Sequence, residues 1–146
     1  MVYTADTPVF SGDIFIFTGV SDALASNDAN WNVHGDWTNH TAPIAGASVV
    51  FNATSTNKPC TWDLTFTFEM LYSSDGYSGV LTQTCNMNFE TFQWEGGTFT
   101  GSTTYTLYLT GDFLHYSGTI TPSYLNMVMN GTDTTLERYG LALSDS

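Results

Sequence analysis

The sequence predicts an all-β protein, and three observations carry this prediction. Residues 60–71 alternate apolar and polar side chains, which is the period of a half-buried β-strand. The chain is rich in aromatic residues and threonine, and both favour strands over helices. No segment shows the spacing of a long amphipathic helix. We therefore expect about eight to ten strands in an antiparallel sandwich or in a closed or partly closed barrel, with meander connections.

The elements follow from apolar runs and from alternation along the chain. Residues 14–17 form a continuous apolar run between glycines, which predicts a strand covered on both faces. Alternation resumes over residues 31–37, and residues 48–53 predict a third strand that leads into the strand at 60–71. Further strands are expected at residues 80–90, 98–110, 113–121, 124–130 and 134–143.

Short turns separate these strands, and their spacing sets the expected topology. Asn130-Gly131 is a two-residue hairpin signal, so we expect consecutive antiparallel strands in the C-terminal half. A change of phase at Glu90 and Thr91 predicts a bulge or a bend. We find no internal repeat of fixed period and no linker, so residues 1–146 are interpreted as one domain.

Charge excludes two classes of partner. Lys58 and Arg138 are the only basic residues besides histidine, and the formal net charge of the chain is −12. Nucleic acid and anionic membranes both require a patch of Lys and Arg, which this chain cannot assemble. We therefore expect neither as a partner.

The composition favours an extracellular or surface location. Residues 1–20 have no basic n-region, and no apolar run reaches the roughly 20 residues of a membrane span, so we expect neither a signal peptide nor a transmembrane helix.

Cys60 and Cys85 permit one disulfide, which we expect because the predicted location is extracellular. A hairpin at residues 75–76 would hold them roughly 20 Å apart, so pairing needs an earlier turn or a contact across sheets. Sequons for glycosylation occur at Asn39, Asn52 and Asn130.

No metal or cofactor is expected, with calcium as the one ion left open. Asp28, Asn30 and Asn32 have the alternating oxygen ligands of a calcium loop, although Val33 stands where an EF-hand needs glycine. The histidines and nearby acids are interpreted as solvent-facing strand residues, because transition-metal sites show tighter clusters. These four residues are His34, Asp36, His40 and His115.

Catalysis is a minor hypothesis, and we leave the question of an enzyme open with a negative expectation. Carboxylates border the aromatic strands, and two of them facing each other across a cleft could act as acid and base on a glycoside. The candidates are Asp63, Glu69, Glu90 and Glu95. No serine elbow, phosphate loop or Cys-His constellation is present.

The aromatic residues carry the main functional hypothesis, which is non-enzymatic recognition, most plausibly of carbohydrate in a lectin-like manner. Aromatic rings stack on the apolar faces of sugars or line ligand pockets, although many will belong to the core. The residues that we assign to binding are Trp31, Trp37, Tyr72, Tyr77, Trp94 and Tyr124. Tyr72, Tyr77 and Tyr124 lie in or beside predicted turns, so we expect them to be exposed.

A structural role is the alternative hypothesis. Abundant threonine, the near absence of lysine and the many strand edges are consistent with a subunit that self-assembles into a filament, a pilus-like fibre or a particle shell. The partners expected under these two hypotheses are carbohydrate and other copies of the chain.

One resemblance adds a second alternative. Gly35-Asp36-Trp37 on an early strand and Arg138 on the last strand resemble the calycin pattern, in which a basic side chain covers a tryptophan near the start of a barrel. The resemblance implies a small-ligand carrier, beside which a glycan-active enzyme is kept open. If the face of the last strand that carries Arg138 points inward, Arg138 should stack on Trp37, and Arg138→Ala should lower the free energy of unfolding by more than about 2 kcal/mol. The alternative is a solvent-facing arginine, for which the same substitution changes that free energy by less than about 0.5 kcal/mol.

Overall fold

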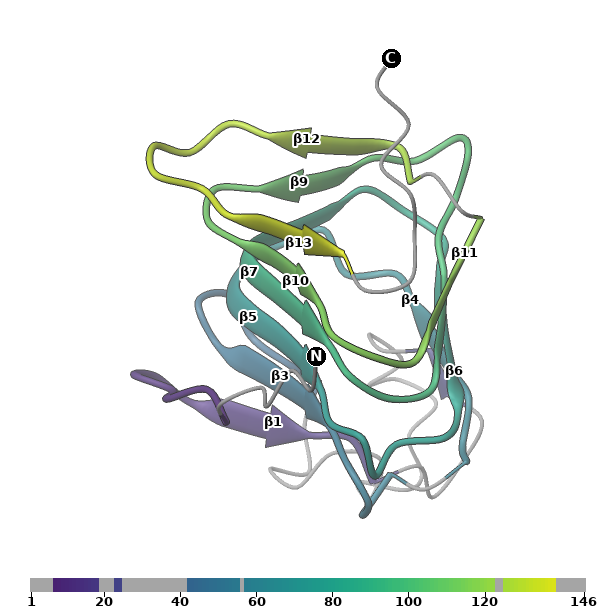
Figure 1. The fold of residues 1–146 in the computed structure, drawn as a ribbon. Helices are drawn as coiled ribbons and strands as arrows, with labels where there is room; N and C mark the ends of the chain where they lie inside the picture. The colour runs from purple at the N-terminus through teal and green to yellow at the C-terminus, as the bar shows by residue number, and fades with distance from the viewer. Residues whose placement is uncertain (1–6, 19–22, 25–41, 56, 123–124, 139–146) are drawn as a thin grey trace.

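The strands of the protein wind into a parallel β-solenoid of about 4 turns, as a computed structural model shows (Figure 1). The structure describes residues 7–18, 23–24, 42–55, 57–122 and 125–138. The strands in these ranges are β1 (Ile14–Ile16), β2 (Ala23–Leu24), β3 (Ser48–Phe51), β4 (Cys60–Trp62), β5 (Thr67–Ser73), β6 (Val80–Gln83), β7 (Met87–Trp94), β8 (Thr98–Thr100), β9 (Leu107–Leu109), β10 (Phe113–His115), β11 (Thr119–Thr121), β12 (Met127–Met129) and β13 (Leu136–Arg138).

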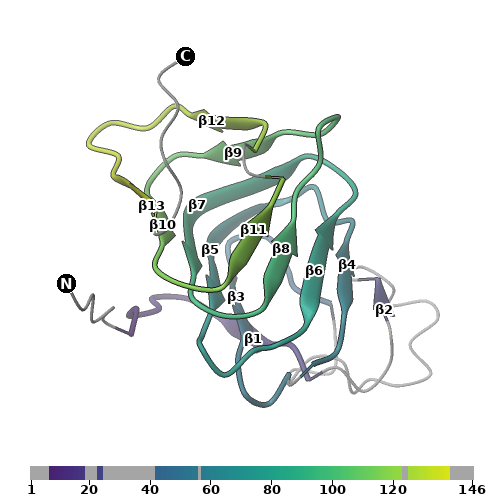
Figure 2. The same cartoon turned by 45° about the vertical axis from the view of Figure 1, so that its right-hand side comes forward.

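The solenoid has three faces, and we name each by its strands. The first face contains β1, β3, β10, β13 and the C-terminal parts of β5 and β7. The second face contains β2, β4, β6, β8 and β11, which lie side by side in Figure 2. The third face contains β9, β12 and the N-terminal parts of β5 and β7. Every pairing among these strands is parallel, so each turn of the solenoid forms a rung that repeats the path of the rung before it.

This fold overturns the expected antiparallel sandwich or barrel. The ladder is parallel throughout the described residues, and Asn130-Gly131 is a corner between β12 and β13 instead of a hairpin turn. The predicted strand at 60–71 is interrupted at residues 63–66, where the chain turns from the second face to the third. Alternation of apolar and polar residues gives the period of a strand but not the direction of the neighbouring strand. The predicted all-β class was therefore right, and the predicted antiparallel topology was wrong.

The register exposes a repeat that the sequence analysis missed. One inward column of the first face consists of Val49, Leu71, Phe92, Phe113 and Leu136, which are successive partners 22, 21, 21 and 23 residues apart. These positions share apolarity and no common residue type. Solenoid rungs need only matching burial and corners, so the repeat is carried by position and not by identity.

Aromatic residues fill the interior between the faces. The ring of Phe92 stacks on that of Phe113, with centroids 5.3 Å apart, and meets Phe99 of the second face edge-on at 5.1 Å. Trp62 of the second face lies against Phe89 of the third face at 5.4 Å. Burial of such large side chains is the main stabilising contribution in a fold without a second layer of secondary structure.

The corners bring backbones close together and require glycine at matching positions. Gly97 and Gly118 end the corner between the first and second faces in successive rungs, with φ of 69° and 75°. A Cβ on Gly118 would lie 2.9 Å from the carbonyl oxygen of Gly97.

β7 bends at the corner between the third and first faces. Phe89 and Phe92 are both buried although they are three residues apart, because the strand passes from one face to the next between them. The predicted bend at Glu90 and Thr91 is therefore confirmed.

The N-terminal segment that contains Phe10 and Ser11, called the crossing segment below, covers part of the first face. Phe10 packs on the outward side chains of Val50, Met70 and Tyr72, and its ring centroid lies 6.2 Å from that of Tyr72. Within the described part of the chain, no helix has the length and apolar character that crossing a membrane requires.

Candidate functional site

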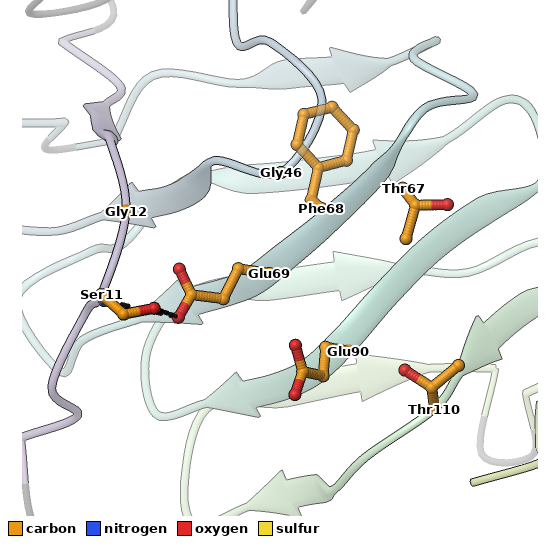
Figure 3. A pocket seen from close by; sticks show the side chains of 8 residues that line it. All are labelled: Ser11, Gly12, Gly46, Thr67, Phe68, Glu69, Glu90 and Thr110. Atoms are coloured by element: carbon orange, nitrogen blue, oxygen red, sulfur yellow. Dashed lines mark hydrogen bonds between the residues drawn. The ribbon is translucent and has the colours of Figure 1, made fainter.

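A shallow hollow lies where the N-terminal segment crosses the corner between the third and first faces (Figure 3). Its volume is about 350 Å³. The side chains and backbone that line it come from five separate stretches of the chain. They are Ser11, Gly12, Gly46, Thr67, Phe68, Glu69, Glu90 and Thr110. This hollow is the place where the structure brings two of the predicted catalytic carboxylates together.

Register places Glu69 beside Glu90 in the neighbouring rung. The flanking pairs Phe68–Phe89 and Met70–Thr91 are direct partners, so the two glutamates lie on adjacent strands about 4.8 Å apart in the pairing direction. In Figure 3 Glu69 points toward the N-terminal segment, and Glu90 lies beside it.

Hydrogen bonds hold the Glu69 carboxylate. Ser11 donates to Oε1 from its hydroxyl at 2.5 Å and from its backbone N–H at 3.4 Å. Ser48 donates its hydroxyl to Oε2 at 3.2 Å. These bonds, the Ser11 hydroxyl first, lower the pKa of Glu69 from its ordinary value, against a smaller opposing effect of burial.

This geometry fits a structural contact that holds the N-terminal segment against β5 better than it fits a catalytic acid and base pair. A general acid of the glycosidase type needs a raised pKa, whereas the pKa of Glu69 is lowered and its oxygens are already engaged. The residues lining the hollow include no basic side chain. Among the described residues there is also no group of three or more His, Cys, Asp or Glu side chains able to hold a metal ion.

The other two predicted carboxylates lie at different corners. Glu95 follows β7 at the corner between the first and second faces, where its Oε2 accepts a hydrogen bond from Gln93 at 2.9 Å. Asp63 follows β4 at the corner between the second and third faces. The structure therefore joins Glu69 with Glu90 and separates both from Glu95 and Asp63.

The predicted binding aromatics that the structure describes are buried. Trp94 is fully buried in the interior, and Tyr77 is 1% exposed with its hydroxyl donating to the carbonyl of Lys58 at 2.9 Å. Tyr72 is outward but covered by Phe10, and burial, with Glu95 nearby, raises its pKa. The expectation that Tyr72 and Tyr77 are exposed is wrong, because the corner turns Tyr77 inward and the crossing segment covers Tyr72. Trp31, Trp37 and Tyr124 lie outside the described residues.

The two cysteines are thiols in the structure and form no disulfide. Cys60 pairs with Leu81, four residues before Cys85, a separation of roughly 13 Å along an extended chain. This distance is beyond the reach of a disulfide. Cys85 instead donates weakly to the carbonyl of Leu64 at 3.5 Å. Parallel rungs thus replace the expected pairing with two separate thiols.

Several predicted positions cannot be placed. The calcium candidates Asp28, Asn30 and Asn32, together with Asn39 and Trp37, lie outside the described residues. The same holds for His34, Asp36 and His40, and for the side chain of Arg138, whose backbone belongs to β13. The remaining two sequons are described: Asn52 is partly exposed and Asn130 is exposed. The expectation that His115 faces solvent is wrong, because its register partner is the fully buried Trp94 and His115 is itself buried. Its Nε2 lies 3.1 Å from the carbonyl oxygen of Gly118.

The C-terminal edge of the solenoid, formed by β11, β12 and β13, is the second candidate site. Within the described residues, each of these strands pairs on one side only, with β8, β9 and β10 respectively. Leu136 continues an inward column whose preceding member, Phe113, is fully buried, yet Leu136 is 41% exposed. Met127 and Met129 on β12 are only partly buried. The inward column of the first face therefore ends, within the described residues, at a partly exposed side chain.

Sequence reasoning missed Ser11, Ser48 and Leu136. The serines reach Glu69 only through the fold, and no local pattern signals their contact. Leu136 was assigned to a final strand, but its place at the end of a column depends on the repeat that was not found. Comparisons with protein-family models, with curated proteins and with solved structures found no match.

Proposed function

We propose that this chain is a non-enzymatic structural module that assembles end to end with copies of itself. The observation that carries the proposal is the C-terminal edge, where the apolar column of the interior ends at the exposed Leu136. Repeat solenoids normally end in a rung with a polar outer face, since an open apolar end favours association. Another rung stacked on this edge would bury Leu136 as Phe113 is buried.

Backbone hydrogen bonding supports a partner of the same kind. Among the described residues, the strands of the C-terminal edge pair on one side only, and strand edges are templates for further strands. At the opposite edge, β1 pairs with β3 and β2 pairs with β4. Stacking one edge on the other is a head-to-tail contact that does not close on itself, and such contacts generate filaments.

The proposal includes a location outside the cell or on a particle surface, and no cofactor. The chain has only 11% charged residues and many threonines, which suits an exposed architectural protein. A net charge of −12 makes nucleic acid and anionic lipid poor partners for this chain.

The test is the state of association as a function of concentration. Light scattering after size-exclusion chromatography and negative-stain electron microscopy should show growing linear assemblies for the wild type. Leu136→Asp should remain monomeric, because it places a charge at the contact. Val80→Asp is the matched control, since Val80 is an aliphatic residue of similar exposure (39%) on β6, which is paired on both sides and lies at neither edge.

Circular dichroism must show that both variants keep their strand content, and Leu136→Asn offers a milder change if the aspartate variant unfolds. A wild-type protein that stays monomeric at the highest concentration reached would overturn the proposal. Equal assembly of wild type and the Leu136 variants would also overturn it.

Carbohydrate recognition is the second candidate function, now on different residues. Tyr108 is exposed on the third face, in the column that continues through Asn88 to Thr67, and Phe66 and Tyr105 are exposed beside it. Exposed rings beside amide and hydroxyl groups suit sugar binding. A glycan array on the wild type and on Tyr108→Ala tests this candidate, which predicts binding that the substitution abolishes.

A further inference from the structure

Threonines form a continuous ladder on the outside of the second face. Thr61, Thr82, Thr100 and Thr121 are successive partners on β4, β6, β8 and β11. The residues that precede them in these strands, such as Leu81 and Phe99, are buried, so the threonines point outward. Figure 2 shows the four strands side by side.

A second column extends the ladder in the other direction. Thr98 and Thr119 are partners two residues before Thr100 and Thr121, so β8 and β11 both present a Thr-x-Thr pair. Hydroxyls then recur about every 4.8 Å across the strands and about every 6.6 Å along them. Val80, the partner of Thr98, continues this column with a side chain of the same shape.

The positions of these threonines are fixed by the rungs beneath them. Leu81, Phe99 and Ile120 lie in the interior directly behind the ladder and are nearly or fully buried. β4, β6 and β8 each have a paired strand on both sides. The central strands of this face therefore have no free edge for an added peptide strand, and a ligand must bind through the side chains.

The face is also uncharged. β4, β6, β8 and β11 contain no Asp, Glu, Lys or Arg, although the chain as a whole contains 14 acidic residues. A charged polymer or an ion has no counter-charge on these strands. The ligand that fits is neutral, extended and repeats its hydrogen-bonding groups in two dimensions.

Strand propensity alone does not account for the ladder. Threonine is favoured in strands, and Thr–Thr pairs stabilise sheets, but these preferences apply to all three faces. The outward column of the third face holds four different residue types, Thr67, Asn88, Tyr108 and Val128. Among the outward columns of the described strands, four successive threonines occur only on the second face.

We propose that this threonine face is an ice-binding surface. Each threonine carries one hydroxyl that donates and accepts hydrogen bonds and one methyl group that limits the disorder of adjacent water. A rigid lattice of such groups holds first-layer water at repeating positions, and a water layer with two fixed repeats of a few ångströms can merge with the surface of an ice crystal. This activity is independent of the proposed end-to-end assembly, since the second face lies along the side of the solenoid.

The experiment measures ice binding by the wild-type chain and by single-residue variants. Wild type should produce thermal hysteresis, inhibit ice recrystallisation and partition into a slowly growing ice front. Thr82→Tyr and Thr100→Tyr should lose all three activities, because one bulky ring prevents the lattice from approaching ice. Thr104→Tyr is the control, because Thr104 is an exposed threonine in the corner between β8 and β9 and belongs to neither threonine column; it should retain wild-type activity.

Circular dichroism and thermal unfolding establish that the variants are folded. Thr100→Ser serves if the tyrosine variants unfold; it keeps the hydroxyl, removes the methyl group and should reduce hysteresis. Absence of hysteresis in the wild type overturns the proposal, as does equal activity of wild type and the second-face variants. Pull-down on crystalline cellulose or chitin without any binding to ice would assign the face to a polysaccharide and overturn it as well.

Discussion

The hydroxyl of Ser11 lies 2.5 Å from a carboxylate oxygen of Glu69, 58 residues later in the chain. This contact and the hydrogen bond from the backbone N–H of Ser11 hold the crossing segment on β5, while the hydroxyl of Ser48 in β3 binds the other oxygen of the same carboxylate. Phe10, next to Ser11, packs on Tyr72 of β5. The segment is therefore held by the apolar packing of Phe10 and by the hydrogen bonds of Ser11.

The polar contact should depend on pH. Because folding lowers the pKa of Glu69 below its ordinary value of 4.5, the stabilisation is fully present above that pH and is lost as the pH falls through the lowered pKa. We expect the Ser11 amide signal in NMR spectra to titrate with a midpoint below 4.5. Glu69→Gln should abolish this titration, whereas Glu90→Gln, in the same hollow, should preserve it. Persistence of the titration in Glu69→Gln would contradict the hydrogen-bonded contact between Ser11 and Glu69.

Much of the fold class was available from the sequence, but not its direction. Alternation at 60–71 identified the strand residues 60–62 and 67–71 but not the corner at 63–66 between them. The change of phase between Phe89 and Phe92 gave the bend at Glu90. The hairpin signal Asn130-Gly131 misled, because asparagine and glycine suit any tight corner, including one between two faces of a solenoid. Rungs of 21 to 23 residues with corners of unequal length obscured the repeat.

Of the candidate site, only the two carboxylates could be predicted from the sequence. Glu69 and Glu90 were selected because they border aromatic strands, and the parallel register then brought them together. Their partner Ser11 is joined by tertiary structure alone. The aromatic assignments failed for a related reason: a residue in a turn is normally exposed, but Tyr77 lies in a corner that wraps its ring onto Phe51, 5.2 Å away.

Gly118 should tolerate alanine poorly, and Gly46 offers a matched comparison. Both have positive φ, so both substitutions carry a backbone cost of about 1–2 kcal/mol. A Cβ on Gly118 would also lie 2.9 Å from the carbonyl oxygen of Gly97, whereas one on Gly46 meets nothing within 4 Å. We expect Gly118→Ala to lower the free energy of unfolding by at least about 1 kcal/mol more than Gly46→Ala. Urea denaturation measures both, and equal losses would show that the corner can relax.

The buried hydroxyl of Tyr77 should contribute measurably to stability. It donates to the Lys58 carbonyl at 2.9 Å, and burial raises its pKa. Tyr77→Phe leaves that carbonyl without this donor and should lower the free energy of unfolding by about 0.5–1.5 kcal/mol. Tyr108→Phe, at an exposed position, should change it by less than about 0.5 kcal/mol. If chemical denaturation gives the same change in the free energy of unfolding for Tyr77→Phe and Tyr108→Phe, the hydrogen bond of Tyr77 makes no net contribution to stability.

Both cysteines should be recovered as thiols. Alkylation after denaturation without reductant should add two groups per chain, detected by mass spectrometry, because Cys60 and Cys85 lie too far apart along their rungs to pair. In the native protein we expect Cys85, which is partly exposed, to react before the buried Cys60. Its reaction should still be slow at neutral pH, since burial raises the pKa of the Cys85 thiol. Recovery of fewer than two thiols in an unoxidised sample would contradict the register of β4 and β6.

The stack of Phe92 on Phe113 should be the most sensitive point of the interior. Phe92 touches rings from two faces and is fully buried, so truncation removes contacts that no neighbour can replace. Phe92→Ala should lower the free energy of unfolding by about 3–5 kcal/mol. Phe66→Ala is the control: the same atoms are removed from a side chain that is 52% exposed, so the loss should stay below about 1.5 kcal/mol. If both variants unfold at the same urea concentration, the rings of Phe92 and Phe113 do not form the centre of the core, and the inward columns of the solenoid must be assigned differently.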